Sequence, residues 1–302
     1  MVSIGYLTLA TLIAFYYAVG RIFYPIERYI DIWVSVQRAK PSAERISLLL
    51  EQPEEKIEGK LSFPQEVREI VFSNVSFSYN PNREVLTNIN LRVKGGEWIA
   101  IVGESGSGKT TLAKLIPRFY DPTKGSIKIN GIDIREYKLD ELRSKCIYLD
   151  SKAYLFNLSV RENITLGEDF SEDEIVKVCK ICKIDFVKDL NTRVGEGGEL
   201  LSEGQRQRIA LARAIIRRSA ILILDEALSG VDAKTEGQIL RELRKMNMIV
   251  FIISHRLSTI RTADEIVLLH EGRIVAEGTH DELYRYSDIY RALIRRQVIK
   301  EE

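Results

Sequence analysis

A glycine-rich run, GESGSGKTT, occupies residues 103–111 and follows a strand-like run that ends at residue 102. Glycines at three positions let the backbone wrap a phosphate so that its N–H groups point inward. The lysine can then reach the terminal phosphates, and the first threonine hydroxyl can ligate Mg²⁺. The sequence therefore predicts a nucleotide site formed by Gly103, Glu104, Ser105, Gly106, Ser107, Gly108, Lys109, Thr110 and Thr111.

Two adjacent carboxylates, Asp225 and Glu226, end the apolar run AILILDE, which is typical of a strand buried on both faces of a parallel sheet. We expect Asp225 to hold Mg²⁺ through water, and Glu226 to polarise the water that attacks a γ-phosphate. His255 follows the next apolar run, MIVFIIS, and could reach the same phosphate. Solvated carboxylates and a structural histidine are the alternatives. The carboxyl edge of a parallel sheet is where α/β proteins bind ligands, which favours the functional interpretation.

A second candidate anion site lies in LLSEGQRQRIALARA, residues 200–214, where a short loop runs into a basic helix. Ser202, Gly204 and Gln205 stand at the helix start, where free N–H groups and the helix dipole favour an anion. Glu203 places a negative charge in the middle of that site.

The N-terminal residues form an uncharged apolar run, IGYLTLATLIAFYYAVG, which ends at Arg21. At about 17 residues it reaches the lower limit for a helix that spans a membrane. A signal peptide and a buried amphipathic helix of a soluble protein are the alternatives. No basic residue precedes the run and no small-residue cleavage site ends it, which disfavours a signal peptide. Arg21, Arg28, Arg38 and Lys40 follow the run, and this excess of cations places its downstream side in the cytoplasm.

Composition excludes several other classes of protein. The 302 residues are 45% hydrophobic, which suits a globular protein with a full core. The chain has 44 basic and 43 acidic side chains, a balance that argues against a nucleic-acid-binding arm. Cys179 and Cys182 form a C-x-x-C pair without the second pair that a zinc site needs. Together with Cys146 they are predicted to be buried, reduced thiols, as on a cytosolic face.

The order of the patterns predicts a mixed α/β organisation. Residues 1–50 are predicted to form a transmembrane helix with a cytoplasmic extension, 51–65 a linker, and 66–302 a nucleotide-binding domain with a helical subdomain at about 137–216. A helix at 234–246 between the two long apolar runs indicates a β-α-β unit. The chain then predicts a hairpin that turns at Glu271-Gly272, and a final helix over 280–297.

These motifs, in this order, resemble the ATPase domain of ABC transporters over about residues 66–300. The matching features are the phosphate loop, the signature LSEGQ at 201–205, the strand LILDE at 222–226, SGVD at 229–232 and the switch His255. The resemblance implies a P-loop NTPase with a RecA-like core and antiparallel β and helical subdomains, which binds ATP and Mg²⁺ and hydrolyses ATP. Glu226, His255 and Lys109 are the implied catalytic residues. Tyr79 matches the aromatic that stacks on adenine, its alternative being an ordinary strand tyrosine.

The resemblance also implies partners. LFNLSVRENI, residues 155–164, resembles the stretch that contacts the membrane part of exporters, and residues 1–50 resemble the last transmembrane helix of an exporter half. In the family, two ATPase domains dimerise head to tail, so that Ser202, Gly204 and Gln205 face a γ-phosphate held by the partner's phosphate loop. The expected setting is therefore a second ABC half transporter and a transmembrane domain in the cell membrane, with the ATPase domain on the cytoplasmic side.

Two residues depart from the family pattern. Glu203 replaces the usual Gly, and its carboxylate either repels the partner's phosphate or points to solvent. Ser151 stands where the family has a Gln that contacts Mg²⁺ and water, so that metal coordination there needs an extra water. These departures suggest a heterodimer with unequal sites; a homodimer that tolerates both is the alternative. A soluble ABC-type ATPase that acts on DNA or ribosomes, and a truncated ATP-binding remnant, are the competing functions.

Overall fold

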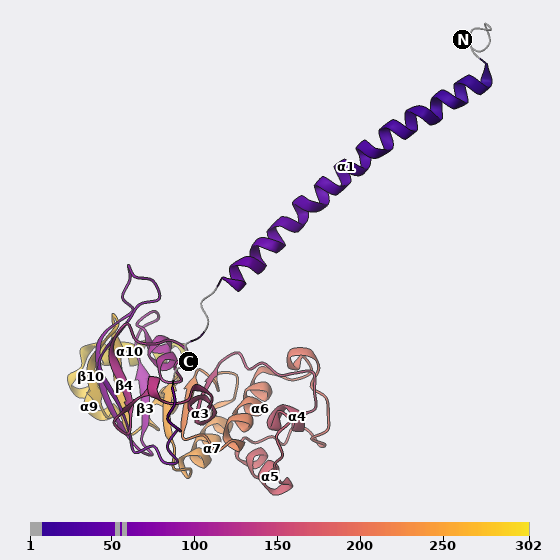
Figure 1. Cartoon of the computed structure of the whole chain (residues 1–302). Coiled ribbons are helices and arrows are strands. Elements are labelled where there is room, and N and C mark those ends of the chain that lie inside the picture. Colours follow the sequence, from indigo (N-terminus) through magenta and orange to yellow (C-terminus); the bar gives the residue numbers. More distant parts are fainter. Residues whose placement is uncertain (1–7, 52–54, 56–58, 302) are drawn as a thin grey trace. The chain divides into compact units, whose positions relative to one another are not determined.

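The computed structural model describes residues 8–51, 55 and 59–301 of the chain, without the side chains of 297–301. Two compact units are distinguished, Met1–Lys56 and Ile57–Glu302, and each is described by itself (Figure 1).

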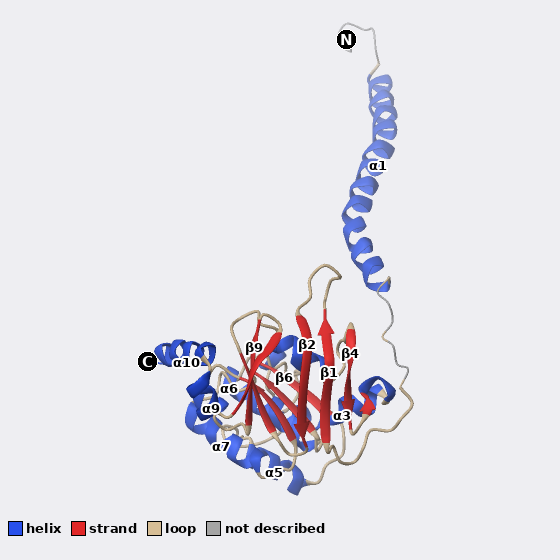
Figure 2. Ribbon diagram, turned by 90° about the vertical axis from the view of Figure 1, so that its left-hand side faces the viewer, coloured by secondary structure: helices blue, strands red, loops and turns tan. Residues whose placement is uncertain are grey.

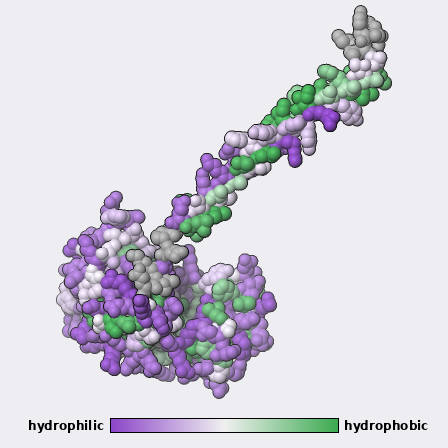
Figure 3. All heavy atoms as spheres, viewed as in Figure 1, coloured by the Kyte–Doolittle hydropathy of each residue, from purple (hydrophilic) through white to green (hydrophobic). Residues whose placement is uncertain are grey.

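The N-terminal unit consists of one long helix, α1 (Leu9–Leu50). The Thr8 side chain caps it by accepting a hydrogen bond from the Thr11 N–H at 3.2 Å. None of its described residues is buried, and Pro25 and Pro41 lie inside it. Forty-two residues make a helix of roughly 63 Å, about twice the hydrocarbon thickness of a bilayer. In the described part of the chain, α1 is the one helix long and apolar enough to cross a membrane, and Figure 3 shows hydrophobic residues along it.

The second unit contains two sheets (Figure 2). In its described residues, the larger sheet has the order β10-β9-β3-β8-β7-β6. Strands β6 to β9 and β3 run parallel, and β10 pairs antiparallel with β9. The smaller sheet is antiparallel, with the order β2-β1-β4-β5. The strands are β1 (Glu69–Phe77), β2 (Leu86–Lys94), β3 (Trp98–Val102), β4 (Lys124–Ile129), β5 (Ile132–Asp133), β6 (Cys146–Asp150), β7 (Ile221–Asp225), β8 (Ile249–Ile253), β9 (Glu265–His270) and β10 (Arg273–Gly278).

Helices surround the larger sheet and carry the connections between its strands. The helices are α2 (Lys109–Leu115), η2 (Ile134–Glu136), α3 (Leu139–Lys145), α4 (Val160–Thr165), α5 (Glu172–Ile181), η3 (Glu196–Gly198), α6 (Glu203–Ile216), α7 (Ala233–Arg244), α8 (Leu257–Ile260), α9 (His280–Tyr286) and α10 (Asp288–Glu301). The expected α/β class with an antiparallel β part and a helical part is confirmed. Residues 137–216 also contain β6, a strand of the parallel sheet, beside the helices α3 to α6.

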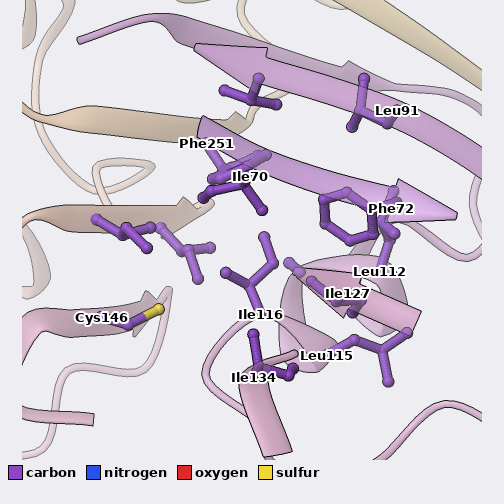
Figure 4. Packing of buried hydrophobic residues seen from close by; sticks show 14 of the residues in the cluster. Ile70, Phe72, Leu91, Leu112, Leu115, Ile116, Ile127, Ile134, Cys146 and Phe251 are labelled. Carbon is purple, nitrogen blue, oxygen red and sulfur yellow. The ribbon is translucent and has the colours of Figure 1, made fainter. Parts of the chain in front are cut away.

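One core cluster lies between the two sheets, around α2, and a second packs α4 to α7 against the larger sheet. Figure 4 shows Leu112, Leu115 and Ile116 among side chains of both sheets, with Ile70 and Phe72 above them. Leu112 and Leu115 of α2, and Ile116 directly after it, are fully buried. The residues of β3, β7 and β8 are buried without alternation, as expected of strands covered on both faces. This packing fixes the carboxyl ends of three parallel strands at one edge.

Some local predictions hold and one is wrong. The hairpin of β9 and β10 turns at Glu271-Gly272 as expected, and both residues have positive φ. The three cysteines are free and buried, and burial raises the pKa of each thiol. The final helix is not continuous, because it breaks at Ser287 into α9 and α10. The Ser287 hydroxyl accepts from the Tyr290 N–H at 3.2 Å, so that it caps a new helix instead of extending the old one.

Part of the segment assigned to the linker belongs to the second unit and packs on it. The Lys60 and Leu61 N–H groups both donate to the Glu136 carbonyl at 2.9 Å. The Phe63 N–H donates to the Glu141 carboxylate at 2.8 Å, and the Phe63 ring packs on Tyr137.

Burial of Tyr290, a residue of α10, predicts how the stability of the fold depends on pH. Tyr290 is fully buried, and burial raises its pKa to about 12. The neutral phenol stabilises the fold fully below pH 10, and this contribution is lost as the pH rises toward 12, because the unfolded tyrosine ionises first. We expect urea unfolding to show about 2 kcal/mol more loss of stability between pH 9 and 12 in the wild type than in Tyr290→Phe. Equal losses in the two proteins would contradict this assignment.

Candidate nucleotide site

The loop between β3 and α2 can be built only with glycine at two of its positions. At Gly103 φ is +156°, and a Cβ would lie 2.2 Å from the Leu269 carbonyl oxygen. At Gly108 φ is +102°, and a Cβ would lie 2.8 Å from Leu86 Cδ2. The loop therefore passes too close to β9 and β2 for any side chain there. This leaves its backbone N–H groups, with the start of α2, available to an anion.

Ser107 gives independent support for a ligand at this loop. Its side chain is 5% exposed, and its hydroxyl oxygen has no hydrogen-bond partner in the described part of the chain. A buried hydroxyl without a partner is costly, and a phosphate oxygen could accept its hydrogen bond.

Lys109 begins α2 and folds back over the loop. Its Nζ donates to the Gly103 and Glu104 carbonyls, each at 2.8 Å. Burial lowers the pKa of the ammonium group, while the charges of Glu226 and Asp225 oppose that shift. The cation is thus held between the loop and the acidic end of β7, where an incoming phosphate would meet it.

Glu226 and His255 meet at the ends of neighbouring strands. His255 Nε2 lies 2.8 Å from Glu226 Oε1, and both side chains are partly exposed. Glu226 has φ of +54°, which is unfavourable for a side-chain-bearing residue by about 1–2 kcal/mol. Its N–H donates to the Ile253 carbonyl at 2.9 Å, which holds this conformation against β8. Strain of this kind at a sheet edge is typical of functional sites.

One pocket brings most of the predicted nucleotide residues together. Its lining is Val85, Ser105, Gly106, Gly108, Lys109, Thr110, Thr111, Glu226, Ile253 and His255. Gly103, Glu104 and Ser107 complete the same loop without lining this pocket. Val85 and Ile253 were not predicted as site residues. Both are apolar; Val85 lies in the loop before β2, and Ile253 ends β8.

Asp225 is 7% exposed and is held by a residue that the motifs did not reveal. The Tyr148 hydroxyl donates to Asp225 Oδ2 at 2.7 Å across the β6–β7 pair. Burial raises the pKa of Tyr148, and the hydrogen bond and charge of Asp225 raise it further. Tyr148 therefore stays a donor at neutral pH and orients the carboxylate.

The donors at this edge fit Mg²⁺. A carboxylate at Asp225 and a hydroxyl at Thr110 are hard oxygen ligands, and Mg²⁺ usually takes only one or two protein groups beside phosphates and water. No group of three or more His, Cys, Asp or Glu side chains placed to hold a metal occurs among the described residues, so a protein-only metal cage is absent from that part. Asp150 pairs in register with Asp225, and Ser151 follows it directly.

A reciprocal cap between Ser202 and Gln205 closes the start of α6. Ser202 caps the helix: its hydroxyl accepts from the Gln205 N–H at 3.3 Å, while its own N–H donates to Gln205 Oε1 at 2.9 Å. Gly204 is buried, and a Cβ there would lie 2.3 Å from the Gly230 carbonyl oxygen. In the part of the chain that the structure describes, none of these three residues lines the pocket around Lys109.

Glu203 is exposed, but its carboxylate is not simply directed to solvent. Gln207, one turn along α6 and 2% exposed, donates through Nε2 to Glu203 Oε1 at 3.3 Å. The same amide donates to the Ser151 carbonyl at 3.0 Å and lies 3.2 Å from the Ser229 hydroxyl, and it accepts from the Gly230 N–H at 2.9 Å. Gln207 thus joins α6 to the ends of β6 and β7.

Tyr79 lies beside the phosphate loop but outside the pocket lining. Its hydroxyl is 3.2 Å from the Thr111 hydroxyl, and its ring makes edge contacts with Phe77 and Tyr120. The ring is 47% exposed, so a planar group could stack on it. Its assignment to adenine stays a prediction.

The larger sheet carries a phosphate loop after β3 and an acidic pair after β7, and the capped helix α6 follows the segment LSEGQ. This combination is that of a P-loop nucleotide-binding domain. Residues 86–229 match the ABC transporter family.

Relatives extend this likeness beyond the ATPase domain. The chain is 40% identical, over 303 aligned positions, to the ATP-dependent lipid A-core flippase of Escherichia coli (strain K12), covering 96% of this chain and 52% of the flippase. The flippase of Salmonella typhimurium (strain LT2) is 41% identical with the same coverage. The fold is similar to that of a bacterial Atm1-family ABC exporter with ATP bound, with a TM-score of 0.78 and 32% identity, covering 93% of this chain and 51% of that one. The chain thus spans about half the length of the relatives that it matches.

Proposed function

We propose that the chain binds and hydrolyses ATP as the motor part of an ABC exporter. The observation that carries this proposal is the convergence of Lys109, Thr110, Glu226 and His255 on one pocket beside a glycine loop. Lys109 would bind the terminal phosphates, and Glu226, beside His255, would polarise the attacking water. Mg²⁺ held by Thr110 and Asp225 would neutralise the developing charge on the phosphates.

We further propose that the chain acts in the cell membrane with a second half transporter. The match to exporters covers 96% of the chain, including α1, and this favours a membrane motor over a soluble ATPase of the same class. In this arrangement the ATPase domain lies in the cytoplasm, α1 belongs to the transmembrane domain, and Ser202, Gly204 and Gln205 face the partner's nucleotide. A helix start whose caps are satisfied internally still offers its dipole and outer N–H groups to such an anion.

The test uses membranes from cells that express the full chain. Carbonate-washed membranes should retain it, and adding a second half transporter should give Mg²⁺-dependent phosphate release that is lost in Lys109→Ala. Recovery of the chain in the soluble fraction, or phosphate release equal to that of Lys109→Ala, would contradict the proposal.

Glu203→Gly tests whether the two nucleotide sites of the proposed dimer differ in activity because of Glu203. A carboxylate near a partner's phosphate costs about 1 kcal/mol in a wet interface. We therefore expect the variant to raise ATP turnover at the site that this chain's signature completes by about fivefold, measured with the partner's catalytic site intact. An unchanged rate would make the Glu203 departure neutral and remove its support for unequal sites.

A further inference from the structure

Arg256, the residue after His255, forms hydrogen bonds to the loop 228–231, which follows β7. Its guanidinium donates to the Val231 carbonyl at 2.6 Å and to the Ser229 carbonyl at 2.9 Å. It also forms an ion pair with Glu236 of α7. Two backbone carbonyls and one carboxylate match the rigid fork of arginine, which a lysine cannot reproduce.

The partner carboxylate is buried and fully engaged. Glu236 is 4% exposed, and its other oxygen accepts from the Thr259 hydroxyl of α8 at 2.6 Å. A buried carboxylate is tolerated when it is paired and hydrogen-bonded, and removal of either partner leaves an uncompensated charge. The ion pair therefore joins α7, α8 and the loop 228–231 into one unit.

Leu228 and Val231 of this loop are buried in the core, but the loop also borders a hollow. A cavity of about 110 Å³ lies beneath it, with an apolar lining that includes Leu228, Leu240 and Ile252, and with Glu226 and His255 at its wall. On the side of the hollow the loop makes fewer close contacts than a fully packed interior segment does. Its polar anchors are Arg256 on one side and Gln207, which accepts from the Gly230 N–H, on the other.

We infer that Arg256 is a positioning residue: paired with Glu236, it holds the loop 228–231 and so fixes the end of β8 that carries His255 against Glu226. The expected effect on ATP hydrolysis rests on the proposed function. The expected effect on the loop 228–231 rests on the geometry alone. Because Gln207 ties the same loop to α6, the Arg256–Glu236 pair also sets the loop against the signature helix.

Arg256→Lys in the full 302-residue chain tests the role, with Arg261→Lys as the matched control and with the second half transporter present wherever ATP turnover is measured. Arg261 lies on the same short segment but contacts His280 instead of the loop. In Arg256→Lys we expect kcat for ATP to fall at least tenfold while KM stays within twofold, because the phosphate loop is untouched. Amide exchange at Ser229, Gly230 and Val231, whose N–H groups are all hydrogen-bonded in the structure, should accelerate about tenfold. Glu236→Gln should produce the same local acceleration, and Arg261→Lys neither change.

Two results would overturn the inference. One is exchange at these three amides in Arg256→Lys within twofold of the wild type. The other is acceleration spread evenly over all strands with a parallel rise in KM, since that would mean a general loss of stability. The exchange measurement needs no nucleotide. Failure of the wild type to hydrolyse ATP with the second half transporter present would therefore contradict the proposed function and leave the loop assignment to be decided by exchange.

Discussion

Glu226→Gln is expected to lower kcat for ATP hydrolysis by about a thousandfold while ATP affinity stays within about twofold. General-base catalysis contributes about 10²–10⁴ to a rate, and glutamine keeps the size and hydrogen-bonding of the side chain without its basicity. The His255 ring, 2.8 Å from the carboxylate, would still contact the amide. Glu226 lines the pocket from the end of β7 and does not belong to the loop 103–111 that we propose to hold the phosphates, so we expect binding not to need its charge.

Steady-state phosphate release and equilibrium ATP binding measure the two effects separately. Glu242→Gln is the matched control, because Glu242 is an exposed carboxylate of α7 that pairs with Lys245. It should behave as wild type in both assays. Hydrolysis by Glu226→Gln at more than a tenth of the wild-type rate would show that another group is the base.

Lys109→Ala should weaken ATP binding itself by about 10- to 100-fold. Hydrogen bonds to charged groups contribute about 1.5–3 kcal/mol, and this ammonium group sits where the terminal phosphates would lie. The loss also removes two hydrogen bonds to the Gly103 and Glu104 carbonyls, so the loop itself becomes less ordered. Both effects act on affinity before any chemical step.

Isothermal titration with ATP and Mg²⁺ measures this affinity directly. Lys114→Ala, a lysine in the last turn of the same helix, is the control and should bind ATP as the wild type does. Equal affinities for Lys109→Ala and Lys114→Ala would place the phosphates elsewhere.

Local sequence patterns predicted the elements that carry the site. The continuous apolar runs became β7 and β8, buried at every position, because strands covered on both faces cannot alternate. Glycine at 103, 106 and 108 predicted the loop, since all three adopt positive φ. The break at Ser287 was missed, although a serine followed by an aspartate is a helix-start signal in the middle of an apolar pattern.

The missed site residues act over long sequence distances. Tyr148 meets Asp225 from a strand 77 residues away, and Arg256 reaches a loop 25 residues back, so no spacing rule could pair them. Gln207 is different, since it lies four residues after Glu203 on one helix face, where such pairs are expected. That spacing could have predicted a hydrogen bond from Gln207 to the carboxylate of Glu203.

The proposed division of the site between two chains is tested most directly by turnover in nanodiscs that hold a single copy of the chain. We predict that single-chain discs hydrolyse ATP at less than about a hundredth of the rate of discs that also hold the second half transporter, and that Ser202→Ala slows the partner's site. Full-speed hydrolysis by single chains, unaffected by Ser202→Ala, would contradict the account.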